Sequence, residues 1–247
     1  TPFTWTLRDR ERILDLFEQL TGARLLYNYI WPGGLAHDLP PNFIAKTEEF
    51  LDYFEPQIQE YNNLLTTNKI FIERTADVGI IPVDVGINYG VSGPTLRASG
   101  VSYDLRKDEP YSVYDKFDFD IPVGKGDMGT VGDCWDRYWV RVKEIEESVK
   151  ILRQAIKSIP EGDVQSAMPK RIRPKKGEVY SRYESARGDV GFYIRSGGKN
   201  MPSRLKMRSP AYCNLSILNE VSAGWMMSDV ITILGSLDIV LGEIDRW

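Results

Sequence analysis

Apolar residues recur every three or four positions near the start of the chain, the spacing that one face of an α-helix produces. The pattern predicts a first helix over about residues 8–20, which Gly22 ends. Residues 31–41 are rich in Pro and Gly and indicate a loop, and Pro41 suits the first turn of a second helix. Pro56 is expected to kink or end that second helix, because proline removes a backbone donor and clashes with the preceding turn.

The clearest helical pattern covers residues 134–158, where aromatic and apolar side chains recur at spacings of three and four. Asp133 precedes it in the position of an N-cap, and Pro160 closes its end. A last helix is predicted to start near Asn214 and to continue through Leu234.

Between these helices the periodicity changes twice. Residues 68–132 are poorly periodic and rich in Gly and Ser, which suits backbone that packs closely against a neighbour or a ligand. Three short alternating runs, "GEVYSRYES", "DVGFYIRS" and "SRLKMRS", then predict a small antiparallel meander over about residues 177–209. The predicted fold is therefore mainly α, a helix bundle across residues 1–247 that carries a small antiparallel β meander.

Composition narrows the class of protein. The 247 residues are 42% hydrophobic and 27% charged, which is typical of a globular chain and excludes disorder as its main state. A formal net charge of −4 argues against nucleic acid as the main partner. The basic run over residues 169–177 lacks interleaved aromatic residues, so it is interpreted as a solvated loop or as one that docks on an acidic partner.

Two further features concern the chain's surroundings. The apolar stretch over residues 221–242 contains Asp229 and Asp238, which are costly in a bilayer, so it indicates a buried helix of a soluble protein. The sequence opens at Thr1 without a Met, and we expect it to be a processed chain or part of a longer one.

The residues that bind metals most often are scarce. Cys134 and Cys213 lie far apart, and His37 is the only histidine, so a zinc site or a cysteine-ligated cluster is not expected. The acidic stretch "YDKFDFDIPVGKGD" lacks the Gly and Glu of a calcium loop. His37 is interpreted as a loop residue with a structural hydrogen bond.

Two charged clusters are stronger candidates for function. The chain ends in "LGSLDIVLGEIDRW", where Asp238, Glu243 and Arg246 interrupt the most apolar segment. In "ESARGDVG", Glu184 and Arg187 crowd a predicted hairpin turn. Buried charges must be paired, so the second cluster forms either an ion-paired hairpin or the polar wall of a cavity.

Four segments together resemble one family. They are "RERILDLFEQLTGAR", "SGPTLRASGVSYDLRKDEPYSVYDKFDFDIPVG", "GDCWDRYWVRVKEIEES" and "ILGSLDIVLGEIDR", and they spread over nearly the whole chain. The chain resembles the hydrogenase-like, 49 kDa-type subunit of respiratory complex I. That family is similar in fold to the large subunit of NiFe hydrogenases, so the resemblance implies a hydrogenase-like helix bundle.

The resemblance also gives the end of the chain a meaning. In NiFe hydrogenases a terminal DPCxxCxxH motif supplies cysteine ligands, whereas "DIVLGEIDR" keeps the acid and replaces the ligands by Val240, Glu243 and Arg246. Because these side chains cannot form a soft metal site, the resemblance implies a cavity without metal that holds a quinone headgroup. The implied site consists of a catalytic residue, Asp238, and of the quinone-binding residues Val240, Arg246, Glu184 and Arg187.

The implied function is that of one subunit of an ion-translocating NADH:quinone oxidoreductase. The chain would bind no cofactor itself, would face the 4Fe–4S cluster of an iron–sulfur partner subunit, and would be inactive alone. It would lie peripherally on the cytoplasmic face of a bacterial inner membrane and contact the membrane subunits.

The chain departs from the family pattern in two respects. It matches only the C-terminal part, without the β-region that carries a His and a Tyr thought to bind quinone, and Leu26 occupies a position that is often His. Two alternatives therefore stay open. One is a non-catalytic scaffolding subunit of a hydrogenase-related membrane redox complex, and the other is an active NiFe hydrogenase, against which the missing cysteine pairs argue.

Overall fold

The computed structural model describes residues 2–169 and 171–245. Contacts within the chain divide it into two compact units. The first unit holds the residues up to Leu65 together with Ser148–Ile172, and the second holds Thr66–Glu147 together with the residues from Arg173 onward. The long helix α7 (Cys134–Lys157) contributes to both.

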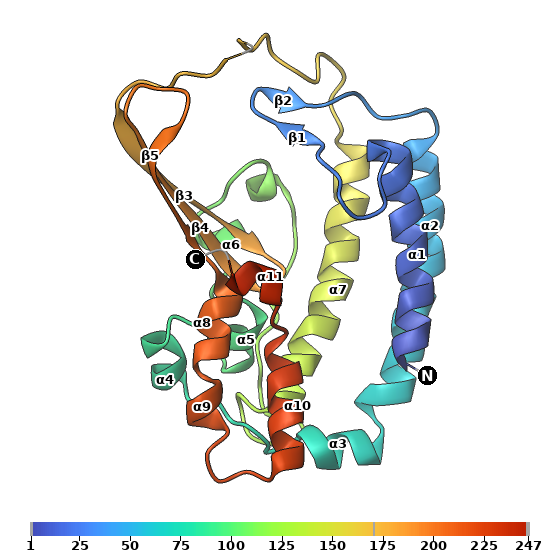
Figure 1. The fold of residues 1–247 in the computed structure, drawn as a ribbon. Helices are drawn as coiled ribbons and strands as arrows, with labels where there is room; N and C mark the ends of the chain where they lie inside the picture. The colour runs from blue at the N-terminus through green and yellow to red at the C-terminus, as the bar shows by residue number, and fades with distance from the viewer. Residues whose placement is uncertain (1, 170, 246–247) are drawn as a thin grey trace. The chain divides into compact units, whose positions relative to one another are not determined.

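The first unit is built around two helices that lie side by side, α1 (Pro2–Thr21) and α2 (Phe43–Tyr61) (Figure 1). Its buried apolar core consists of Phe50, Leu51 and Ile58 of α2 with Val149 of α7. The predicted first helix is therefore correct, but it begins six residues earlier than expected. The apolar pattern missed that turn because Phe3 is exposed and marks no buried face.

Proline had less effect on α2 than predicted. Pro56 lies inside the helix, which continues to Tyr61 before a π-helical segment, η1 (Asn62–Thr66), replaces the α pattern. Leu51 and Ile58 on either side of the proline are both buried in the core, and this packing outweighs the lost backbone hydrogen bond. The expectation that Pro41 lies in the first turn was also wrong, since the helix begins at Phe43.

The loop predicted for residues 31–41 contains a minimal hairpin. Its strands β1 (Ile30–Trp31) and β2 (Gly34–Leu35) pair antiparallel. Gly33 makes the turn with φ of 97°, a conformation that other residues rarely adopt. Two-residue strands leave no alternation for sequence analysis to detect.

Most elements of the second unit are short. The poorly periodic stretch holds helices of four to seven residues, too few for an apolar repeat to show. These are α3 (Lys69–Thr75), α4 (Val83–Asn88), α5 (Pro94–Ala98), α6 (Leu105–Asp108) and the 3₁₀ turn η2 (Tyr114–Lys116).

The core of the second unit gathers buried apolar side chains from these short helices, from α7 and from the C-terminal helices. Arg137 of α7 is fully buried there. Its guanidinium donates to the carbonyls of Gly132 and Gly79 at 2.6 and 2.8 Å and to Ser236 Oγ at 2.8 Å. These bonds fix α7 to the chain around it and to the C-terminal region.

The C-terminal helix is not continuous, contrary to the prediction. It consists of α8 (Pro210–Ser216), α9 (Leu218–Val221), α10 (Met227–Leu237) and α11 (Leu241–Ile244). Gly224 has φ of 84° between α9 and α10, and Asp238 has φ of 52° after α10. These left-handed residues turn the chain, so the apolar positions face one core from several short helices.

The predicted meander is confirmed. Strands β3 (Gly177–Ser185), β4 (Gly188–Ser196) and β5 (Pro202–Arg208) form an antiparallel sheet in the order β3-β4-β5. Its base contacts α6 and α8 (Figure 1). The fold is therefore mainly α with small antiparallel sheets, as predicted. No helix in the described ranges is long and apolar enough to span a membrane.

Candidate functional site

A pocket of about 400 Å³ lies in the second unit, between α3, α7 and the end of α10. Aromatic and small side chains form most of its wall, and one arginine and one aspartate supply the charge. The lining residues are Phe71, Thr75, Cys134, Tyr138, Arg141, Thr232, Gly235, Ser236 and Asp238. The predicted catalytic residue, Asp238, therefore borders a cavity.

Asp238 is placed by the end of α10. It is the C-cap residue of that helix, and its left-handed conformation turns the chain toward α11. Arg187, on the turn between β3 and β4, donates from Nε to the Asp238 carbonyl at 2.8 Å and from Nη2 to Oδ1 at 3.4 Å. Arg187 and Asp238, which the resemblance assigned to one site from two separate motifs, are therefore in direct contact.

The turn that carries Arg187 is held by the Gly-rich segment before α5. Gly93 has φ of 67°, and a side-chain carbon there would lie 2.5 Å from the Arg187 carbonyl. Ser92 Oγ accepts from the Asp189 amide at 3.1 Å, and Asn214 Nδ2 donates to the Arg187 carbonyl at 3.3 Å. The close backbone approach predicted for this glycine-rich stretch is therefore correct, and it positions Arg187.

Arg141 is a pocket residue that sequence analysis missed. Its Nε lies 3.7 Å from Asp238 Oδ2, whereas Arg187 contacts the other carboxylate oxygen, Oδ1. Nη1 donates to the Arg137 carbonyl at 2.7 Å, whereas Nε is buried without a hydrogen-bond partner among the described residues. Burial lowers the pKa of Arg141 to about 10, although Asp238 acts in the opposite direction.

The arrangement can bind a small polar group. A carboxylate lies between two guanidinium groups at the edge of a cavity whose other walls consist of two aromatic rings and small side chains. The buried Arg141 Nε has no hydrogen-bond acceptor among the described residues, and its nearest acid, Asp238 Oδ2, lies 3.7 Å away. Phe71 and Tyr138, whose ring centroids are 4.8 Å apart, provide a surface for a flat ring.

Glu184 lies on the same hairpin but does not line this pocket. Its Oε1 accepts from Arg97 Nη1 at 2.8 Å, and Arg97 also pairs with Asp104 at 3.4 Å and Glu144 at 2.6 Å. Burial raises the pKa of Glu184, although the charge of Arg97 opposes that effect. The hairpin therefore includes a buried ion-paired cluster, as one interpretation of "ESARGDVG" predicted. Arg187 bonds to the pocket residue Asp238 but does not line the pocket itself, so the other interpretation, a polar cavity wall, stays a prediction.

The remaining predicted residues lie at the chain end. Val240 is the N-cap residue of α11 and is not among the residues that line the pocket. Arg246 lies outside the described residues, and a role for either in binding quinone stays a prediction. Glu243 stabilises the fold, because its Oε1 accepts from Ser209 Oγ at 3.0 Å and from the Ala211 amide at 3.1 Å. It thereby joins α11 to the start of α8.

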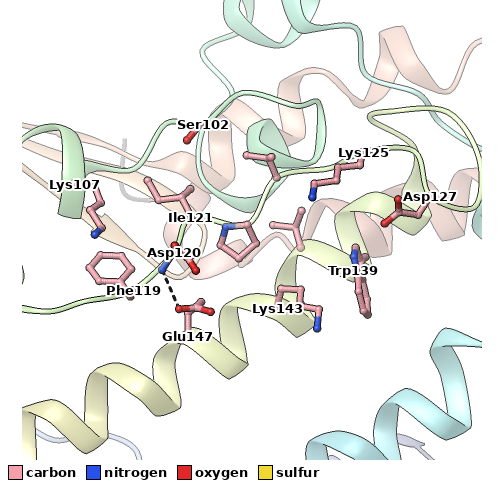
Figure 2. Close-up of a pocket in the computed structure, with 13 residues that line it drawn as sticks. Ser102, Lys107, Phe119, Asp120, Ile121, Lys125, Asp127, Trp139, Lys143 and Glu147 are labelled. Carbon is pink, nitrogen blue, oxygen red and sulfur yellow. Dashed lines mark hydrogen bonds between the residues drawn. The ribbon is translucent and has the colours of Figure 1, made fainter.

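A larger hollow of about 690 Å³ lies elsewhere along α7, where the chain over residues 119–127 passes the helix (Figure 2). Figure 2 shows Glu147 of α7 accepting from the Asp120 amide, a bond of 2.9 Å. Lys143 Nζ lies 4.6 Å from the ring centre of Trp139 and also pairs with Glu146. None of the predicted site residues lines this hollow, so the pocket beside Asp238 is the stronger candidate.

In residues 2–169 and 171–245, no group of three His, Cys, Asp or Glu side chains is arranged so that it could bind a metal ion. Cys134 is buried with its Sγ accepting from Arg137 at 3.0 Å. His37 contacts the Leu20 carbonyl, the structural hydrogen bond expected of it.

Comparisons with known proteins identify the family to which the chain is similar. The family described as the 49 Kd subunit of respiratory-chain NADH dehydrogenase matches residues 1–178 and 167–246. The D-type subunit of the NADH-quinone oxidoreductase of Chlorobium luteolum is 54% identical over 250 residues, which cover 100% of this chain and 63% of that protein.

Two other relatives are subunits of the same type and are similarly identical to this chain. The corresponding subunit of Chlorobaculum tepidum is 52% identical over 100% of this chain and 62% of its own length. In Cytophaga hutchinsonii, an NADH-quinone oxidoreductase subunit of the same type is 51% identical over 100% of this chain and 65% of its own length. The chain thus spans slightly less than two thirds of the length of these curated relatives.

Proposed function

Because the chain belongs to the family of the 49 kDa subunit of respiratory-chain NADH dehydrogenase, we propose that it forms part of a site where quinone is reduced. The observation that carries this proposal is the pocket of about 400 Å³ beside Asp238, with Arg141 and Arg187 on the two oxygens of the carboxylate. In this proposal the quinone headgroup enters that pocket.

The two arginines and the aspartate would have different roles. Arg141 Nε would donate to a headgroup oxygen, whose negative charge grows as electrons arrive, and fixed donors stabilise such charge well in a dry site. Arg187 would hold the Asp238 backbone and carboxylate in place through its bonds of 2.8 and 3.4 Å. Asp238 would keep Arg141 oriented and pass protons toward the reduced headgroup.

Reduction of quinone to quinol takes two electrons and two protons. We propose that a 4Fe–4S cluster in an iron–sulfur partner subunit supplies the electrons and that this chain binds no redox cofactor. The other partners would be the remaining subunits of the complex, including membrane subunits reached by peripheral contact. Since the relatives from Chlorobium, Chlorobaculum and Cytophaga are bacterial, the proposed location is the cytoplasmic face of a bacterial inner membrane.

Asp238→Asn in the assembled enzyme tests the role of the carboxylate. Asn adopts the left-handed conformation readily, so the turn after α10 is retained while the charge is lost. Quinone reduction per assembled complex is expected to fall about 100-fold or more, the scale of a lost acid–base or electrostatic contribution. Asp245→Asn, an exposed acid in the same segment, is the matched control and should have normal turnover.

The scaffolding alternative makes a different prediction for the same variants. A subunit that never touches substrate would give either a silent Asp238→Asn complex or one that does not assemble. Complex yield and quinone turnover are therefore measured together. Normal turnover in a fully assembled Asp238→Asn complex would overturn the proposed role. Val240→Met extends the test, because a larger side chain near the pocket is expected to change inhibitor sensitivity without preventing assembly.

A further inference from the structure

The charge of the chain is unevenly distributed, and the β meander carries most of its excess positive charge. Residues 171–208 contain eleven Lys and Arg but only three Asp and Glu, whereas the whole chain has a formal net charge of −4. Within the second unit, the base of the meander contacts α6 and α8. Its three strands run from this base to a far end (Figure 1). We define this meander end as Lys176–Tyr180, Tyr193–Ser196 and Pro202–Lys206.

One face of the meander end is a basic hollow. It has a volume of about 660 Å³, and its cationic side chains are Lys176, Arg195 and Arg204. Arg195 and Arg204 are direct cross-strand partners, so their side chains leave the sheet on the same face. Neither side chain makes a hydrogen bond or ion pair with another described residue. Glu178, the one acid in the hollow, is the cross-strand partner of Arg195 on β3, and its carboxylate accepts from Tyr193 Oη at 2.5 Å.

Two like charges directly opposite each other destabilise a pair of strands. The cost is removed when an anion binds between them, and paired guanidinium groups match the geometry of a carboxylate well. The hollow thus holds three cationic side chains and a single acid, and it can accept a further anionic group from outside the described chain.

The other face of the meander end is apolar. Val179, Ile194 and Leu205 are in register across the three strands, so they form one continuous row. They are 58%, 38% and 49% exposed, in a sheet whose main helix contacts, with α6 and α8, lie at its base. An exposed apolar row beside charged groups is typical of the centre of a protein interface.

We propose that the meander end docks on another protein chain, which presents carboxylates to Arg195 and Arg204 and an apolar wall to the row of Val179, Ile194 and Leu205. A protein is favoured over an anionic bilayer because the two features lie on opposite faces of the sheet. A flat membrane meets only one face, whereas a cleft in a protein contacts both. This surface is separate from the pocket beside Asp238, so the proposal does not depend on the proposed quinone site.

Charge reversal in the full-length subunit of the assembled enzyme tests the proposal. Arg204→Glu should reduce the fraction of subunit that stays bound after washing with moderate salt by about tenfold or more, because a partner carboxylate would then face a like charge. Lys157→Glu, on an exposed residue of α7, changes the net charge equally and should have no such effect. Quinone turnover per assembled Arg204→Glu complex should be normal, which separates this result from a failure of the quinone site.

A second variant identifies the partner directly. Arg204→Lys keeps the charge and introduces an amine that a carbodiimide can join to a carboxylate in contact. Peptide mass spectrometry of the treated complex should find that amine linked to an Asp or Glu of another chain. Equal retention of Arg204→Glu and Lys157→Glu, or the absence of any interchain link, would overturn the proposal. Binding to phosphatidylglycerol vesicles that Arg204→Glu abolishes, without an interchain link, would also overturn it in favour of lipid.

Discussion

Buried charges in this protein are stabilised by several partners at once, and Asp9 on α1 is the simplest case. Its carboxylate is almost fully buried and accepts from Arg8 Nε at 2.8 Å, from Tyr53 Oη at 2.7 Å and from Tyr61 Oη. Burial alone would raise the pKa of Asp9, but the bonds from Arg8, Tyr61 and Tyr53 together lower it below its usual value. The ionised form is therefore the one that the folded state stabilises.

This pKa shift predicts how stability depends on pH. Because the pKa of Asp9 is lower in the folded than in the unfolded chain, its contribution is present above about pH 4 and is lost as pH falls through the folded value. Asp9→Asn should lower the free energy of unfolding by about 1–3 kcal/mol at neutral pH, and the difference from wild type should shrink below about pH 4. Tryptophan fluorescence in urea at sub-micromolar concentration would measure it.

Glu48→Gln, which neutralises an exposed acid on α2, is the matched control for that experiment and should show no such pH-dependent difference. A difference between wild type and Asp9→Asn that stayed constant from neutral pH down to about pH 3 would contradict the role assigned to the Asp9 carboxylate.

At the scale of elements, the helices of the second unit are positioned by their ends. The start of α7 is held by Asp133, whose Oδ1 accepts from the Asp136 amide at 2.8 Å, as the predicted N-cap requires. Its Oδ2 accepts from the amides of Asp77 at 2.8 Å and Thr130 at 3.2 Å. One side chain thus joins the helix to two loops.

Removal of this cap should cost more than an ordinary N-cap substitution. Asp133→Ala leaves three backbone amides without their acceptor at a buried position, so the free energy of unfolding should fall by about 2 kcal/mol or more. Asp127→Ala, at an exposed position nearby, should change it by less than about 0.5 kcal/mol. Equal effects of the two substitutions in urea unfolding would show that the three bonds do not stabilise the fold.

At the scale of the whole chain, several large apolar side chains are exposed. In the second unit, Met227 and Ile231 of α10 and Leu241 of α11 are well exposed. Leu26, in the first unit, is almost completely exposed. Large exposed apolar groups that gather into patches usually mark a contact with a partner, and Met227 and Ile231 lie four residues apart on α10.

We therefore expect the isolated chain to self-associate at micromolar concentration. Size-exclusion chromatography with light scattering should show broad, high-mass species, and an apolar dye should bind strongly. Ile231→Gln together with Met227→Gln should shift the distribution toward monomer, because these changes remove the exposed apolar groups of α10. A sharp monomeric peak with a cooperative unfolding transition in the wild-type chain would contradict the prediction.

The purified chain is also expected to contain no stoichiometric nickel or iron. Its two cysteines and one histidine are too few for a soft metal site, and Val240 and Glu243 occupy the positions where hydrogenases have thiolates. Elemental analysis of protein purified without chelators tests this. One equivalent of either metal would show that ligands other than these form a site.

The sequence by itself determined the elements whose pattern is long or strictly alternating. Residues 134–158 and the three runs of the meander were predicted nearly to their observed ends, because a buried helix face and a strand each impose a repeat on many residues. Asp238 and Arg187 were also chosen from the sequence, through the resemblance of their motifs to one family.

Only the tertiary structure decided how these parts combine. The broken C-terminal helices depend on left-handed residues such as Asp238, which no apolar period reveals. Arg141 resembles any other arginine on an amphipathic helix, and it lines the pocket beside Asp238 only because α7 passes the end of α10. Local periodicity reports which face of an element is buried, whereas the contacts of a charge depend on residues distant in sequence. Glu184 lies only three residues before Arg187, yet it pairs with Arg97 whereas Arg187 pairs with Asp238, because their partners come from different distant parts of the chain.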